Sequence, residues 1–288
     1  MAQTNLTDTI TLGGDLDVHR LAYGAMRITG AGIWGEPADP AGARQLLEHV
    51  VKQGVDLIDT ADSYGPEVSE NLIAEALHPY PEDLVIATKA GLTRPGPGVW
   101  GRAGRPERLK RCCDDSLRRL KLERIDLYQL HAVDPEVPIE DSVGALAELL
   151  QEGKIRHVGL CNVGVHELER ARAIVPIASV QNRYIVADRA SEDVLAACER
   201  DGLAFLPWFP LATGRLARPG GALDDAARAH GATAAQVALA WLLRHSPVTV
   251  PIPGTSSIDH FDENIAAAQL ELDEHELEAL DAIAPPGG

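Results

Sequence analysis

The sequence has few of the features that mark membrane, secreted or nucleic-acid-binding proteins. No apolar run approaches the roughly 20 residues that a membrane-spanning helix needs. The first ten residues, MAQTNLTDTI, contain neither a basic stretch nor an apolar stretch, so we expect no signal peptide. The net charge of −17 argues against nucleic acid, because a phosphate-binding surface needs concentrated Lys and Arg. These absences favour a cytoplasmic protein that is kept in solution by its acidity.

Cysteine is also scarce. The four cysteines, Cys112, Cys113, Cys161 and Cys198, include no CxxC pair, which argues against a disulfide framework and against a zinc site. No cluster of His, Cys and carboxylates has the spacing of metal ligands, so we expect no catalytic metal. A reduced intracellular enzyme fits this pattern.

The length of 288 residues and the order of the predicted elements indicate one domain over residues 1–288. Barrels of about 250 residues are single domains, and no linker interrupts the chain. Two alternating stretches, 9–12 and 18–23, predict a β-hairpin that leads into the first barrel strand. The other predicted strands are residues 55–58, 84–88, 125–130, 155–160, 179–181, 203–206 and 248–252.

Helical patterns alternate with these strands, and residues 91–104 form a Gly- and Pro-rich loop. The predicted helices are residues 41–52, 68–77, 106–120, 139–151, 165–173, 191–200, 234–244, 259–268 and, at the end, 273–283. Eight strands separated by helices favour a closed barrel over an open sheet. We therefore predict an α/β protein, a (β/α)8 TIM barrel with a short N-terminal β-hairpin.

The glycines at positions 30, 32 and 35 match the pattern GxGxxG, which in a Rossmann fold holds pyrophosphate at a helix N-terminus. Here the next helix is expected to begin near Pro40, several residues after the last glycine. The preferred interpretation is a loop on the barrel rim, and the alternative is a Rossmann motif. In the preferred interpretation Trp34 lines the substrate pocket.

Ionisable residues lie at or just beyond the ends of three predicted strands. Asp59, Lys89 and His131 are at strand ends, and Tyr64 is in the loop after the first of them. In a parallel barrel all strand C-termini open on one face, so these four side chains can meet and form an acid-base site. Taken singly, Asp59 is also suited to cap a helix, and the other three also suit structural positions.

The runs LIDTADSYG (57–65), LYQLH (127–131) and GKIRHVGLCN (153–162), with Lys89, resemble the aldo-keto reductase family over nearly the whole chain. The resemblance implies a nicotinamide cofactor and the reduction of aldehydes or ketones to alcohols. It assigns Tyr64 as proton donor, Lys89 and Asp59 as its modulators, and His131 as the group that polarises the carbonyl. A nearby ammonium such as that of Lys89 is expected to lower the pKa of Tyr64.

The resemblance also implies cofactor-binding residues along the second half of the chain. For the nicotinamide these are Cys161, Asn162, Gln181 and Trp208, and for the pyrophosphate they are Pro210, Leu211 and Arg215. For the adenosine end they are Gly254, Thr255, Ser256, Ser257, His260, Glu263 and Asn264. Cys161 replaces a family serine, and a thiol donates weakly. Gly254 and His260 stand where many relatives carry a basic pair, so we expect a preference for NADPH with measurable use of NADH.

The substrate is not readable from the sequence. Trp34, Trp100 and residues 132–138 are expected to border its pocket, and the short segment after residue 283 predicts an open pocket that accepts bulky aromatic or cyclic carbonyls. An alternative function is that of a regulatory subunit resembling the potassium-channel β-subunits. The four filled catalytic positions favour the enzyme, whose partner is then a small carbonyl compound. The oligomeric state is not predicted.

Overall fold

The fold is a curled sheet of parallel strands surrounded by helices. The computed structural model describes residues 6, 8–208 and 221–284. Seven strands form one sheet in the order β11-β10-β9-β8-β5-β4-β3, and every neighbouring pair is parallel. The strands are β3 (Tyr23–Gly24), β4 (Leu57–Asp59), β5 (Val85–Ala90), β8 (Ile125–Leu130), β9 (Ile155–Cys161), β10 (Ile177–Gln181) and β11 (Ala204–Phe205).

An extended segment, residues 248–253, closes the sheet into a barrel. On one side its backbone bonds β11, through Phe205 N to Val248 O at 2.8 Å and Val250 N to Phe205 O at 2.8 Å. On the other side Gly24 N donates to Pro253 O at 3.2 Å. The predicted barrel is confirmed. The regular strand predicted at 248–252 is wrong, because prolines at 251 and 253 lack the N–H that a strand ladder requires.

The predicted N-terminal hairpin is present as β1 (Thr9–Leu12) and β2 (Leu16–His19), which pair antiparallel. The single stretch predicted at 18–23 is wrong, since the chain leaves β2 after His19 and enters β3 only at Tyr23. Leu12 packs in one cluster with Leu57 and Val85, which begin β4 and β5. The hairpin therefore covers the amino-terminal end of the barrel and leaves the carboxyl end for the site.

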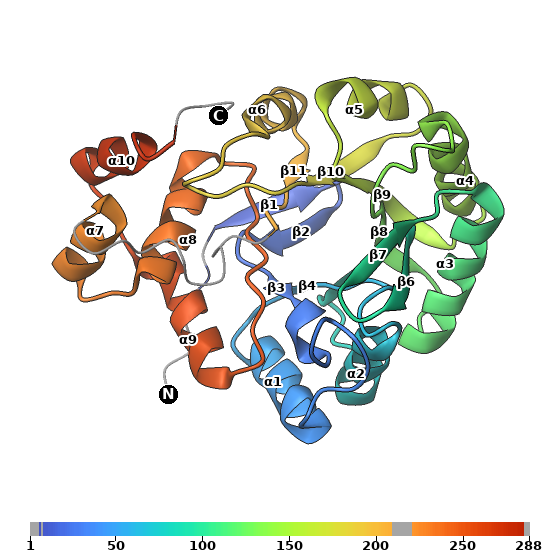
Figure 1. Cartoon of the computed structure of the whole chain (residues 1–288), viewed down its shortest axis with the longest axis horizontal. Helices are drawn as coiled ribbons and strands as arrows, with labels where there is room; N and C mark the ends of the chain where they lie inside the picture. The colour runs from blue at the N-terminus through green and yellow to red at the C-terminus, as the bar shows by residue number, and fades with distance from the viewer. Residues whose placement is uncertain (1–5, 7, 209–220, 285–288) are drawn as a thin grey trace.

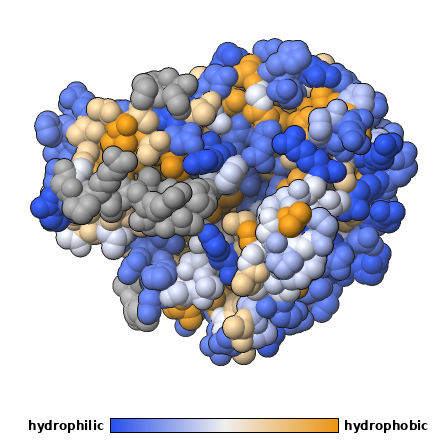
Figure 2. Space-filling view, in the orientation of Figure 1, coloured by the Kyte–Doolittle hydropathy of each residue, from blue (hydrophilic) through white to orange (hydrophobic). Residues whose placement is uncertain are grey.

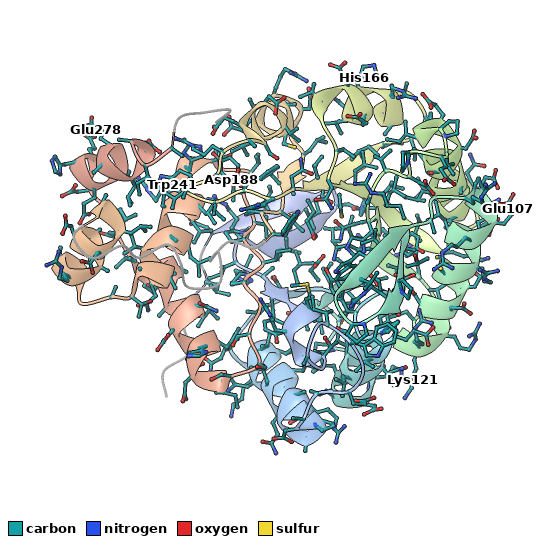
Figure 3. The ribbon with its side chains drawn as sticks, in the orientation of Figure 1. Glu107, Lys121, His166, Asp188, Trp241 and Glu278 are labelled. Carbon is teal, nitrogen blue, oxygen red and sulfur yellow. The ribbon has the colours of Figure 1, made fainter. Side chains whose placement is uncertain are left out.

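Helices form a ring outside the strands (Figure 1). They are α1 (Pro40–Lys52), α2 (Val68–Leu77), α3 (Pro106–Leu120), α4 (Ile139–Gln151), α5 (Val165–Arg172), α6 (Glu192–Asp201), α7 (Ala222–His230), α8 (Ala234–His245), α9 (Ile258–Ala266) and α10 (Glu274–Asp281), with 3-10 turns at Ala25–Ile28 and Ala267–Gln269. Labelled side chains such as Glu107, Lys121 and His166 lie at the outer edge of this ring (Figure 3). The apolar faces of the helices turn inward and bury the largest core cluster against the sheet.

Two elements differ from the predicted order. Residues 91–104 are not an irregular loop, because β6 (Leu92–Gly96) and β7 (Val99–Arg102) form an antiparallel hairpin. Its turn uses Gly98 at a φ of +68°, where glycine is favoured. Helix α7 was not predicted, although Gly231 follows it in the left-handed conformation typical of a helix end.

The helix expected near Pro40 begins there, with Asp39 Oδ1 accepting from Gly42 N at 2.9 Å. The glycines at 30–35 precede it in a loop whose Trp34 bridges to Gly65. The rim-loop interpretation of GxGxxG is confirmed, and the Rossmann alternative is wrong. Among the described residues no helix is long and apolar enough to cross a membrane. The face seen in Figure 2 is largely hydrophilic along its right-hand edge, over α3 and α4.

Candidate active site

Four ionisable side chains meet at the carboxyl end of the barrel. Asp59 ends β4, Lys89 lies in β5, His131 directly follows β8, and Tyr64 lies in the loop between β4 and α2. Their exposed fractions are 2% for Asp59, 0% for Lys89, 8% for His131 and 6% for Tyr64. Four buried polar side chains in contact are a costly arrangement, which is typical of a functional site.

The Lys89 ammonium is held by three oxygens. Nζ donates to Asp59 Oδ2 at 2.7 Å, to the carbonyl of Thr60 at 2.8 Å, and to the hydroxyl of Tyr64 at 3.3 Å. Burial alone lowers the pKa of Lys89, but Asp59 and Tyr64 outweigh it and hold that pKa above its usual value. Lys89 is therefore a charged donor, and Asp59 is an ion-pair partner rather than a helix cap.

The Asp59 carboxylate is also held from its second oxygen. Oδ1 accepts from Gln129 Nε2 at 3.1 Å and from Gln181 Nε2 at 2.8 Å. Gln129 was not singled out from the sequence, although it precedes His131 by two positions on the same strand face. This second set of bonds fixes the carboxylate and, through it, the ammonium.

Burial dominates the acidity of Tyr64. It raises the pKa of Tyr64 to about 12, although the charge of Lys89 acts in the opposite direction. The ammonium lowers this pKa as expected, but a net lowering is wrong, because desolvation of the phenolate outweighs the ammonium. Tyr64 keeps its proton near neutral pH and has that proton to give.

The ring of His131 is packed edge to face against Tyr64, with centroids 5.8 Å apart. Burial, together with the Lys89 charge, lowers the pKa of His131 well below its usual value, so the imidazole is neutral at pH 7. The hydroxyl oxygen of Ser63 lies 3.3 Å from Nδ1. When Ser63 donates to Nδ1, the proton of the neutral ring is on Nε2, which is then a donor for a substrate oxygen.

The predicted nicotinamide residues lie beside this cluster. Cys161 ends β9 and its thiol donates to Gln129 Oε1 at 3.6 Å. Gln181 ends β10, and its Nε2 donates to Asp59. Its Oε1 has no hydrogen-bond partner among the described residues. Asn162 has a φ of +56° and bonds His131 O at 3.0 Å through Nδ2. Its Oδ1 accepts from Trp208 Nε1 at 2.9 Å, so Asn162 ties Trp208 to the histidine strand.

The adenosine-end residues lie in the segment that closes the barrel and in α9. Thr255 is buried, and its carbonyl accepts from Tyr23 at 2.6 Å. Ser257 caps α9 through His260 N at 3.4 Å. Ser256, His260 and Glu263 are exposed, whereas Asn264 is buried. Pro210, Leu211 and Arg215 lie outside the described residues.

Gly254 makes a close backbone approach. A Cβ at this position would lie 2.6 Å from the carbonyl oxygen of Gly24, so no larger residue fits. The same position is 3.5 Å from Cγ of Arg27, an exposed residue of the 3-10 turn Ala25–Ile28. Arg27 was not predicted as a site residue, because nothing in the sequence places residue 27 beside residue 254.

Trp34 and Trp100 are joined by a residue that the sequence did not reveal. The guanidinium of Arg94 lies 3.7 Å from the centroid of Trp100 and 5.9 Å from that of Trp34. It also donates to the carbonyls of Gly32 at 2.7 Å, Ser63 at 3.2 Å and Val99 at 3.1 Å. Trp100 in turn meets His131 edge to face at 6.4 Å. Arg94 therefore fixes both tryptophans relative to the catalytic cluster.

The comparisons with known proteins agree with this geometry. The family model described as "Aldo/keto reductase family" matches residues 20–285. The chain belongs to the aldo/keto reductase family. An uncharacterized oxidoreductase of Schizosaccharomyces pombe is 47% identical over 268 residues, which cover 93% of this chain and 87% of that protein. Pyridoxine 4-dehydrogenase of Escherichia coli is 43% identical over 284 residues, covering 96% of this chain and 99% of its own.

Solved structures give the same assignment. An aldo/keto reductase from Klebsiella pneumoniae, crystallised with NADP and acetate, is 29% identical with a TM-score of 0.80. The match covers 97% of this chain and 96% of that one. This aldo-keto reductase therefore shares the whole barrel with a structure that contains the nicotinamide cofactor.

Proposed function

We propose that this protein reduces aldehyde or ketone carbonyls to alcohols with NADPH, and that Tyr64 donates the proton. The observation that carries the proposal is the buried Lys89 ammonium, which contacts both Asp59 and the hydroxyl of Tyr64. A buried charge of this kind has no evident structural use, since a well-packed apolar group stabilises a barrel at least as well. It has a clear chemical use beside a phenol that must lose a proton.

Each residue has a role in that step. His131, neutral and protonated on Nε2, donates to the carbonyl oxygen and stabilises the negative charge that develops there. Tyr64 passes its proton to the same oxygen. Lys89 stabilises the phenolate that remains, because an ammonium 3.3 Å away in a buried site interacts with it strongly. Asp59 keeps the ammonium in place, with Gln129 and Gln181 holding its other oxygen.

The residues present fit a nicotinamide cofactor. When bound, NADPH supplies the hydride for the carbonyl carbon. Among the described residues Gln181 Oε1 has no partner and is an acceptor for a carboxamide, and Trp208 offers an indole face. Thr255, Ser256 and Ser257 offer hydroxyl donors at the start of α9, where backbone N–H groups also favour phosphate. The complex of the Klebsiella relative with NADP supports the same choice.

The substrate we propose is a bulky aromatic aldehyde, with pyridoxal as the first compound to test. Pyridoxine 4-dehydrogenase of E. coli is 43% identical over almost the whole chain. The 39% exposed indole of Trp100 lies beside His131 and offers a flat apolar wall for a ring. A panel of pyridoxal, benzaldehyde, cyclohexanone and acetaldehyde, with NADPH and with NADH, tests this. Reduction of acetaldehyde alone contradicts the open aromatic pocket.

Tyr64→Phe tests the proton donor. The variant keeps the ring and loses the hydroxyl, so kcat should fall roughly 10²- to 10⁴-fold while NADPH affinity stays within about twofold. Tyr80→Phe is the matched control, because the Tyr80 hydroxyl bonds the carbonyl of Leu120 at 2.8 Å, away from the site. Stopped-flow turnover and fluorescence titration of NADPH measure the two effects. Wild-type turnover by Tyr64→Phe shows that the proton comes from another group.

The same assay separates the enzyme from the alternative function. A regulatory subunit resembling the potassium-channel β-subunits is expected to bind NADPH with little turnover of any carbonyl in the panel. The complete set of Asp59, Tyr64, Lys89 and His131, in mutual contact, supports the enzyme.

A further inference from the structure

A second cavity lies behind the loop that carries Tyr64. Its volume is about 290 Å³, and it is bounded by Asp62, Ser63, Pro66 and Glu67, by β6 and by one face of α3. Neither Tyr64, Lys89 and His131 nor Trp34 and Trp100 line it, and no predicted cofactor residue does. The cavity is therefore separate from the candidate active site, although Asp62 and Ser63, which line the cavity, directly precede Tyr64 in the chain.

Four arginines line this cavity, together with the carboxylates of Asp62, Glu67 and Asp115. Arg94 bonds three carbonyls, and Arg119 pairs with Glu70 and Glu67. The other two, Arg108 and Arg111, form no ion pair within the described part of the chain, and Arg108 bonds the carbonyl of Leu92 at 3.4 Å. They are three residues apart on α3 and so share a face of that helix.

Two side chains of this wall each carry a buried polar atom that lacks a partner. Only four such side-chain atoms occur among the described residues, and two of them are Asp62 Oδ1 and Arg108 Nε. Asp62 is 7% exposed. A buried donor and a buried acceptor without partners cost free energy, and that cost falls when these side chains turn toward a molecule in the cavity that supplies the missing partners.

The charge of Asp62 depends on its surroundings. Burial, together with the nearby carboxylate of Glu70 on α2, raises the pKa of Asp62 to about 7, and the neighbouring Cys112, Arg119 and Arg108 of α3 act in the opposite direction. Asp62 is therefore partly protonated at neutral pH. In that state it does not repel an anion, and it can share a proton with one.

We propose that this cavity is a binding site for the phosphate group of a small molecule, held by Arg108, Arg111 and Asp62. Guanidinium groups bind phosphate oxygens through charge-assisted hydrogen bonds. A phosphate group has a second pKa of about 6, so near neutral pH its oxygens are mainly charged acceptors that can share the proton of a protonated Asp62. Sulfate has the same shape but does not take up a proton in this pH range. The volume leaves room for a small organic group beyond the phosphate.

Such a site is coupled to the catalytic loop by short connections. Asp62 and Ser63 immediately precede Tyr64, and Ser63 Oγ contacts His131. Arg94 borders the cavity, bonds the carbonyl of Ser63 and stacks on Trp100. Occupation of the cavity is therefore expected to change kcat or KM as well as to bind phosphate.

The test is calorimetric titration of inorganic phosphate into the whole protein saturated with NADP, so that the cofactor occupies its own phosphate sites. We expect saturable binding, and weaker binding of sulfate. Arg108→Gln and Arg111→Gln should each weaken phosphate binding roughly tenfold or more. Arg105→Gln is the matched control, because Arg105 precedes the same helix and does not line the cavity; it should change the affinity less than twofold.

Three results overturn the proposal: no saturable binding, equal affinity for sulfate, or the same loss in Arg105→Gln as in the two cavity variants. A melting curve of Arg111→Gln serves as the folding control and should match that of the wild type, since Arg111 is exposed. A second readout is pH dependence. Between pH 6 and pH 8 wild-type affinity should fall relative to Asp62→Asn, because only the wild type gains a carboxylate charge. Parallel profiles contradict the role of Asp62. Binding is measured without substrate, so its failure leaves the proposed reductase activity intact.

Discussion

At the scale of single residues, the site places a protonated phenol, that of Tyr64, beside a charged ammonium, that of Lys89. Tyr64 is buried, and its pKa is raised to about 12, while Lys89 beside it remains charged because of Asp59. The ammonium does not ionise Tyr64 in advance. In the proposed step it stabilises the phenolate as the proton leaves, which is where stabilisation accelerates a reaction.

This arrangement predicts different pH profiles for carbonyl reduction and for alcohol oxidation. A group with a pKa of about 12 is protonated at every pH below 10, so kcat/KM for carbonyl reduction should be flat from pH 6 to pH 10. His131 is neutral throughout this range and adds no titration. Alcohol oxidation needs the phenolate and should rise with pH, up to about tenfold per pH unit. Initial rates in both directions measure this. A reduction rate that falls from pH 8 onward assigns the proton to a more acidic group.

That Asp59, Tyr64, Lys89 and His131 meet was predictable from the sequence, and the reason is geometric. Asp59, Lys89 and His131 each end or follow a parallel strand, and such ends share one face of a barrel. The direction of the pKa shift of Tyr64 was not predictable, because it depends on burial by residues from several strands. Gln129 was missed because a glutamine within an apolar strand gives no signal of its partner, Asp59.

At the scale of elements, the β6–β7 hairpin shapes the substrate side of the site. Arg94 of this hairpin bonds carbonyls from the loop at Gly32, the catalytic loop at Ser63 and its own hairpin at Val99. Three segments distant in sequence are thus joined by one guanidinium. The sequence showed a Gly- and Pro-rich stretch over residues 91–104, and contacts between loops have no periodicity from which to predict them.

Arg94→Met should therefore loosen the aromatic pocket. The substitution removes the three hydrogen bonds and the guanidinium charge that lies over the Trp100 ring. It keeps much of the side-chain volume. We expect KM for an aromatic aldehyde to rise roughly tenfold and kcat to fall less, because the catalytic cluster keeps its own bonds. Arg94→Lys should not restore KM, since an ammonium lacks the planar fork.

Arg102→Met is the control on the same hairpin, since Arg102 is exposed and, among the residues that the structure describes, bonds only the carbonyl of Val133, at 3.0 Å. Steady-state kinetics with a melting curve for each variant separate loss of stability from loss of binding. An unchanged KM in folded Arg94→Met shows that the tryptophans hold their places without the arginine.

At the scale of the whole molecule, the predicted cofactor residues that the structure describes lie in segments from β9 to α9. A closing strand was predicted at residues 248–252, but its irregular backbone was not, because the prolines at 251 and 253 break the strand pattern without removing the apolar run. The net charge of −17 disfavours any anionic cofactor, and it disfavours NADPH more than NADH. A preference for NADPH over NADH must therefore come from hydrogen-bond donors close to the 2′-phosphate.

Those donors predict a moderate preference for NADPH. The segment 254–257 offers hydroxyl and backbone donors, and Arg27 beside Gly254 offers one charge in place of the basic pair of many relatives. Hydrogen bonds to a charged group contribute about 1.5–3 kcal/mol each, so kcat/KM should favour NADPH by more than tenfold and less than a thousandfold. Arg27→Gln should lower kcat/KM for NADPH roughly tenfold and leave that for NADH unchanged. Arg44→Gln, on the exposed face of α1, is the control for charge. A preference for NADH, or equal losses with both cofactors in Arg27→Gln, shows that the 2′-phosphate is bound elsewhere.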